Sequence, residues 1–167
     1  MSMANVRKRN LTQFLILIIA VVAVIAGSIA FQNWWNSRPG PAPEAVAIKA
    51  NGQEVLPYTV CEPGVECPEG KIPQISVPAD GSLRIEVPKD IYDHDWSVLK
   101  IYDDPAANDQ HYFKANEAKD MEIPGSLDGE PRPRLVVVEV STVLIGRNAA
   151  GAETPYTVVW SINAKES

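Results

Sequence analysis

The two cysteines of the chain, Cys61 and Cys67, stand in the segment CEPGVEC, where their thiols could form a disulfide, a redox pair or part of a metal site. Pro63 and Gly64 between them favour a turn that brings the two thiols together. A redox pair normally has the spacing Cys-x-x-Cys, and a zinc site needs two further ligands, whereas both histidines are distant in sequence. We therefore predict a disulfide that fixes the shape of one loop, because closing so short a loop removes little chain entropy.

A run of carboxylates marks the segment KDIYDHDWSVLKIYDD, and it comprises Asp90, Asp93, Asp95, Asp103 and Asp104. Calcium takes six to eight oxygen ligands, which clustered carboxylates can supply. The first three, however, precede a predicted strand and the last two follow it, and a strand of that length separates its ends by more than about 20 Å. The first three also lack the Gly and Glu of a recognised calcium loop. We interpret all five as solvated turn residues and expect no metal ion.

The remaining residues do not form a recognisable catalytic motif. His94 and His111 could make an acid–base or metal pair, but no nucleophile elbow, no His-Glu-x-x-His and no Gly-rich phosphate loop accompanies them. Trp96 and Trp160 stand inside predicted strands, so we expect them to pack in a core rather than to stack on a ligand. The sequence therefore predicts a protein that is not an enzyme and has no catalytic residue and no cofactor.

An apolar segment near the N-terminus is long enough to cross a membrane. Residues 14–31 contain only Gly27 and Ser28 as non-apolar residues. A helix over residues 11–35 reaches roughly 37 Å, which exceeds the hydrocarbon core of about 30 Å. A cleavable signal peptide usually has a shorter apolar region, of about 7–15 residues. We therefore predict a transmembrane helix at 11–35.

Two features bear on whether this helix is retained. The small residues of Ser28-Ile29-Ala30 fit the pattern that a signal peptidase needs. Trp34 and Trp35 follow a full-length span, and tryptophan rings typically lie at the headgroup level of a bilayer. We favour a retained signal anchor over cleavage because of the span length and these two interface residues.

Charge predicts the orientation and excludes one class of partner. Arg7, Lys8 and Arg9 precede the helix, and no acidic residue occurs before Glu44, so residues 1–10 are expected to form a cytoplasmic basic tail. The part beyond the helix is then extracytoplasmic. Without the three N-terminal bases, 12 basic residues stand against 21 acidic ones, a net charge of −9. Such a charge argues against nucleic acid as a partner of the exterior part.

Small residues recur at spacings of three and four along the helix and include Ala23-x-x-x-Gly27. A small-x-x-x-small step lets another membrane helix approach closely. We therefore predict that Ala23 and Gly27, together with Trp34 and Trp35, contact the lipid bilayer or a membrane-protein partner.

The exterior part is predicted to form one β-domain. Residues 36–45 are rich in proline and form a predicted linker, and residues 46–164 suit a single domain. Residues 82–87 alternate Leu83, Ile85 and Val87 with polar residues, which is the period of a half-buried strand. Further strand candidates are 95–103, 135–145 and 156–163, with shorter ones at 46–49, 55–60, 72–77, 112–115 and 121–123. Turn signals separate them, so we predict an all-β, antiparallel, immunoglobulin-like sandwich.

Within this domain the pattern also makes finer predictions. We expect the last two long strands to pair across the loop GRNAAGAETP. In the first of them, one face should carry Val136, Val138, Val140, Thr142 and Leu144. Outside the membrane segment, helical periodicity occurs only weakly, in NEAKDM.

Three stretches carry a resemblance to a known family: IKANGQEVLPYTVCEPGVEC, ISVPADGSLRIEVPKDIYDHDWSVLKIYDDP and VVVEVSTVLIGRNAAGAETPYTVVWSIN. They resemble the domain-of-unknown-function 2771 family of actinobacterial envelope proteins, of the corynebacterial and mycobacterial kind. The resemblance implies a domain outside the cytoplasmic membrane. It implies no activity and no functional residues.

Together these features predict a single-pass protein of the cell membrane. Our leading hypothesis is an accessory or assembly subunit of a larger envelope membrane complex, with a respiratory supercomplex as a candidate host by analogy alone. The alternative is a binding module for an envelope glycan or lipid, with a groove between the sheets as its site. A hydrolase with an unrecognised site is a third hypothesis, which no motif supports.

Overall fold

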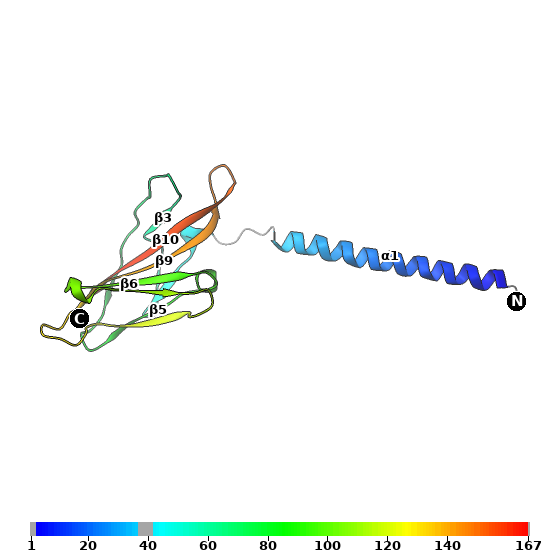
Figure 1. Cartoon of the computed structure of the whole chain (residues 1–167). Helices are drawn as coiled ribbons and strands as arrows, with labels where there is room; N and C mark the ends of the chain where they lie inside the picture. The colour runs from blue at the N-terminus through cyan, green and yellow to red at the C-terminus, as the bar shows by residue number, and fades with distance from the viewer. Residues whose placement is uncertain (1–2, 37–41, 167) are drawn as a thin grey trace. The chain divides into compact units, whose positions relative to one another are not determined.

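The computed structural model describes residues 3–36 and 42–166 of the 167-residue chain. The described residues fall into two separate units, a long helix and a β-domain that follows it along the chain (Figure 1). Each unit is described by itself below.

The first unit is the helix α1 (Met3–Asn36). Its segment Gln13–Trp34 has a mean hydropathy of 3.0, and none of its side chains is buried. A helix that is apolar all round belongs either in a protein core or in a membrane. Since this helix buries none of that surface, it fits a single-pass membrane anchor.

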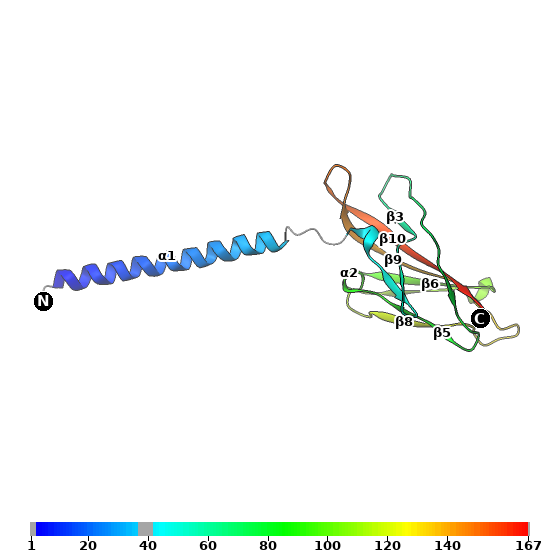
Figure 2. The same cartoon turned by 180° about the vertical axis from the view of Figure 1, so that it is seen from behind.

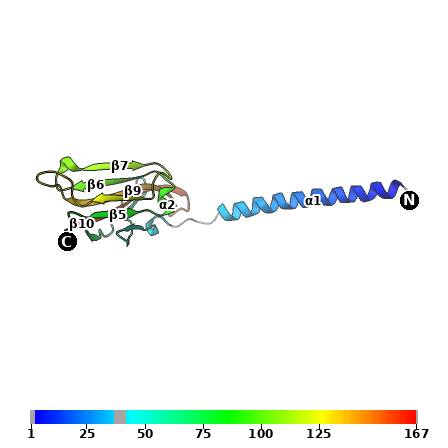
Figure 3. The same cartoon turned by 90° about the horizontal axis from the view of Figure 1, so that it is seen from below.

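The second unit is built from two β-sheets, seen from three sides in Figures 1, 2 and 3. The smaller sheet has the order β2 (Gln53–Val55), β1 (Ile48–Ala50), β5 (Ser82–Glu86) and β8 (Asp120–Pro124). The larger sheet has the order β3 (Thr59–Cys61), β10 (Glu153–Lys165), β9 (Leu135–Arg147), β6 (Trp96–Tyr102) and β7 (Asp109–Phe113). A further strand, β4 (Gln74–Ser76), also pairs with β10. Three short helical turns complete the domain: η1 (Pro43–Ala45), α2 (Lys89–Tyr92) and η2 (Pro105–Ala107).

This topology confirms the predicted all-β sandwich. The strand order is that of an immunoglobulin-like domain. In the smaller sheet, β1, β5 and β8 correspond to strands A, B and E. In the larger sheet, β10, β9, β6 and β7 correspond to strands G, F, C and C′. The two long strands pair in an antiparallel ladder from Glu153↔Arg147 to Asn163↔Val137, as the sequence predicts. One pair departs from the antiparallel rule, because β4 runs parallel to β10, with Gln74 opposite Asn163.

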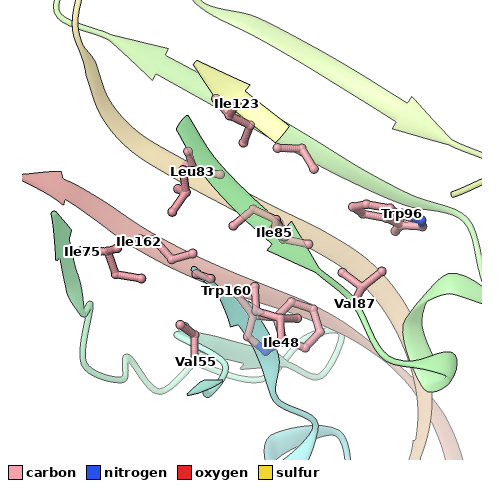
Figure 4. Close-up of a cluster of buried hydrophobic side chains, with 14 of the residues drawn as sticks. Ile48, Val55, Ile75, Leu83, Ile85, Val87, Trp96, Ile123, Trp160 and Ile162 are labelled. Carbon is pink, nitrogen blue, oxygen red and sulfur yellow. The ribbon is translucent and has the colours of Figure 1, made fainter. Parts of the chain in front are cut away.

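The core lies between the two sheets and follows from the alternation of side chains along each strand. Leu83 and Ile85 of β5 face Trp160 and Ile162 of β10, and all four side chains are fully buried (Figure 4). The indole of Trp160 donates a hydrogen bond from Nε1 to the carbonyl oxygen of Val46 at 2.9 Å. Trp96 is 2% exposed, so both tryptophans are core residues, as predicted.

One residue of the predicted β9 face points the other way. Val138, Val140, Thr142 and Leu144 are buried, but the side chain of Val136 is 40% exposed. The ladder between β6 and β9 shifts register there, with Ile101 opposite Val137 and Tyr102 opposite Leu135. Val136 is thus the extra residue of a β-bulge, and Leu135 takes the inward position instead.

The weak helical periodicity of NEAKDM does not correspond to a helix. Asn116 has a positive φ of 63°, so the backbone there forms a turn. A helical turn that the sequence did not predict, α2, lies in the β-domain after Pro88 (Figure 2). Ile91 is its buried residue. Four residues are too few to show a helical period in a sequence.

The β-domain begins before residue 46. Pro43 is buried, and its ring packs against the backbone of Gly146 near the tip of the β9–β10 hairpin. A Cβ atom at Gly146 would stand 2.9 Å from Pro43 Cγ and 2.8 Å from Tyr156 Cε2. Glycine at 146 is therefore required for this close approach of the entering chain.

Candidate functional site

The structure confirms the predicted disulfide between Cys61 and Cys67, whose Cα atoms lie 4.9 Å apart. The loop begins at the end of β3 and exposes the side chain of Val65 by 57%. Gly64, at the turn of the loop, has a φ of +80°, a conformation that favours glycine. The disulfide closes one surface loop beside the large sheet.

Replacing both cysteines by serine should leave the sandwich folded and lower its free energy of unfolding by about 2 kcal/mol or less, because so short a loop costs little chain entropy to close. Thermal unfolding by circular dichroism measures the loss, and mass spectrometry without reductant detects the bond in the native protein. Alkylation of both thiols in the unreduced wild type would contradict the assignment.

The acidic residues at the two ends of β6 accept hydrogen bonds from backbone N–H groups of the protein. Asp95 accepts hydrogen bonds from the backbone N–H of Ala115 at 2.9 Å and from Lys114 Nζ at 3.1 Å. These bonds hold the pKa of Asp95 below its usual value. Asp103 accepts from the backbone N–H of Arg134, and Asp104 accepts from that of Ala106 in the turn η2. Within residues 3–36 and 42–166, no group of three or more His, Cys, Asp or Glu side chains could hold a metal ion.

The two histidines have separate partners. His94 Nδ1 lies 2.6 Å from Oδ1 of the neighbouring Asp93. The ring of His111 on β7 packs against Phe113, with ring centroids 4.5 Å apart. Neither contact joins the two imidazoles, so nothing in this geometry favours an acid–base pair.

The predicted membrane residues lie on α1. Ala23 and Gly27 stand one turn apart in the apolar segment, and, apart from the adjacent backbone of the helix, a Cβ atom at Gly27 would meet no described atom within 4 Å. Trp34 closes that segment, and its ring centroid lies 5.9 Å from that of Phe31. Trp35 belongs to the helix, but its side chain lies outside the described residues.

Sequence reasoning did not find a hollow on the outer face of the large sheet. Its volume is about 350 Å³, and strands β6, β7, β9 and β10 all contribute to its lining. Ser97 of β6 and Ser141 of β9 are opposite each other in the ladder, and their hydroxyl oxygens are 2.9 Å apart. Tyr112 of β7 is the ladder partner of Ser97 and is 69% exposed. Val143 of β9 also lines the hollow and is 50% exposed.

The fold and these surfaces define a class of protein with one apolar helix that fits a membrane anchor and an immunoglobulin-like sandwich domain after it. Residues 39–165 match the family described as "Protein of unknown function (DUF2771)", and the protein belongs to that family. This confirms the predicted family, while the actinobacterial origin stays a prediction. No curated protein and no solved structure matches the chain.

Proposed function

We propose that this protein is a non-enzymatic accessory or assembly subunit of a larger membrane complex of the cell envelope. The observation that carries the proposal is the helix segment Gln13–Trp34, an apolar surface of which nothing is buried in the part of the chain that the structure describes. Lipid or a neighbouring span must cover such a surface. A respiratory supercomplex is one candidate host, by analogy alone.

The proposed orientation places the N-terminus in the cytoplasm and the β-domain outside. Basic residues near a span stay on the cytoplasmic side, and Arg7, Lys8 and Arg9 precede this one. A disulfide between Cys61 and Cys67 agrees with an oxidising, exterior compartment. In this orientation the helix anchors the subunit, while the sandwich is available to exterior parts of the complex.

If the small-residue face of α1 packs on a partner span, Gly27→Leu should lower the recovery of that partner by about fivefold or more. The added bulk prevents close approach and costs about 1 kcal/mol of helix packing. The measurement is affinity purification of the full-length protein in mild detergent, followed by quantitative mass spectrometry. Membrane abundance should not fall, because leucine makes the segment more apolar.

Ser28→Leu is the matched control, since it adds similar bulk about 100° around the helix from Gly27. It should recover the partner as well as the wild type does. Equal recovery by wild type and Gly27→Leu, at equal abundance, would exclude this face as the contact. Purification of the protein without any membrane protein in stoichiometric amount would contradict the proposed function itself.

A second candidate function is a binding module for a glycan or lipid of the envelope. The hollow over Ser97 and Ser141 favours it, because small-molecule sites are concave and combine apolar walls with a few polar groups.

A further inference from the structure

We propose that the hollow on the outer face of the large sheet binds a neutral oligosaccharide. This inference rests on the second candidate function, for which it names the ligand class, and it does not depend on the proposed membrane complex. Ser97, Ser141, Tyr112 and Val143 all line the hollow. Its volume of about 350 Å³ is at the lower end of the range for small-molecule sites, roughly 300–1,000 Å³.

The hydroxyl pair supplies a hydrogen-bond donor that the protein does not use. Ser97 Oγ and Ser141 Oγ share one hydrogen bond of 2.9 Å, and Gln110 Nε2 donates a second, longer one to Ser97 Oγ. Two hydroxyls carry two protons, and the bond between them uses one. Among the residues that the structure describes, no acceptor takes the other proton. It can be donated to an oxygen of a ligand in the hollow.

The charges beside the hollow favour an uncharged ligand. The two charged residues of its lining, Asp95 and Lys114, form an ion pair at 3.1 Å. The carboxylate of Asp95 is further occupied by the N–H of Ala115. With these charges paired to each other, neither an anion nor a cation would find an unpaired opposite charge in the lining.

The exposed ring of Tyr112 favours a ligand that has an apolar face. Among the ring contacts of residues 42–166, none involves Tyr112. The next residue along β7, Phe113, instead stacks on Trp96. A sugar ring has an apolar C–H face that can pack on such a ring, and it carries hydroxyl groups that both donate and accept hydrogen bonds. A saccharide therefore matches the apolar side walls and the hydroxyl floor at the same time.

Frontal affinity chromatography tests this with the full-length protein immobilised in detergent. The probes are tetrasaccharides of glucose, mannose, galactose and arabinose, with tetragalacturonate as the charged comparison. At least one neutral probe should be retarded, and tetragalacturonate should not. Tyr112→Ala should weaken binding about tenfold, Tyr112→Phe should retain most of it, and Ser141→Ala should weaken it about threefold.

Val136→Ala is the matched control, because Val136 is an exposed apolar residue of the same strand as Ser141 but does not line the hollow. It should bind as the wild type does, and thermal unfolding checks that each variant is folded. The proposal is overturned if no neutral probe is retarded, if tetragalacturonate is retarded equally, or if Tyr112→Ala and Val136→Ala bind alike.

Discussion

Replacing Trp160 by alanine should lower the free energy of unfolding of the β-domain by about 3–5 kcal/mol, the usual cost of truncating a large buried aromatic residue. Trp160 is fully buried between the sheets. Its Nε1 also donates a hydrogen bond to the carbonyl oxygen of Val46, near the start of the domain. Loss of the ring leaves a cavity, and loss of Nε1 leaves a buried carbonyl without its donor. Chemical unfolding followed by circular dichroism measures the change.

A pair of conservative variants separates the two effects. Trp160→Phe and Trp96→Phe remove the same volume from two buried side chains, which are 0% and 2% exposed. Within the described chain Trp96 Nε1 makes no hydrogen bond, whereas Trp160 Nε1 does. Trp160→Phe should therefore cost about 1–2 kcal/mol more than Trp96→Phe. Equal losses would show that the bond to Val46 contributes nothing to stability.

Two arginines in the middle of α1, as Val21→Arg with Ile25→Arg, should remove most of the protein from the membrane. An arginine at the centre of a span costs about 2.5–3.5 kcal/mol on insertion scales, so two cost roughly 5–7 kcal/mol. Val21 and Ile25 are one turn apart in the apolar segment, and both side chains are exposed. Alkaline extraction of membranes measures the fraction that stays integrated.

The matched control, Asn10→Arg with Gln13→Arg, adds the same charge at the N-terminal end of the helix, where long side chains reach the interface. It should stay integrated, and a reporter fused after Ser167 should be active only outside the cytoplasm. Retention of the Val21 and Ile25 variant at the wild-type level would contradict a membrane-spanning role for α1. A reporter active in the cytoplasm would contradict the orientation.

The long elements of this fold are predictable because their patterns are local. Alternation of buried and exposed side chains identifies β5, β9 and β10, and the apolar run identifies α1. The edge strand β7 (Asp109–Phe113) was predicted only from residue 112, because its first three residues are exposed and polar. The outward turn of Val136 depends on a register shift against β6, which no pattern within one strand contains.

The candidate site depends even more on pairing between strands. The disulfide was predictable, since Cys61 and Cys67 and the turn between them lie in one short segment. The hollow was not, because Ser97 and Ser141 meet only through the register of β6 against β9. Alternation shows that both serines point away from the core. It does not show that they share a hydrogen bond or that Tyr112 stands beside them.

The close packing of Pro43 on Gly146 places the entry of the chain at the hairpin-tip end of the sandwich. From Tyr156, beside that entry, to Lys165, strand β10 runs about 30 Å at roughly 3.3 Å per residue. The last described residues therefore lie at the opposite end, where Glu166 forms an ion pair with Arg134. A molecule bound at this end of the sandwich would therefore lie about one domain length from Pro43, where the chain enters the domain.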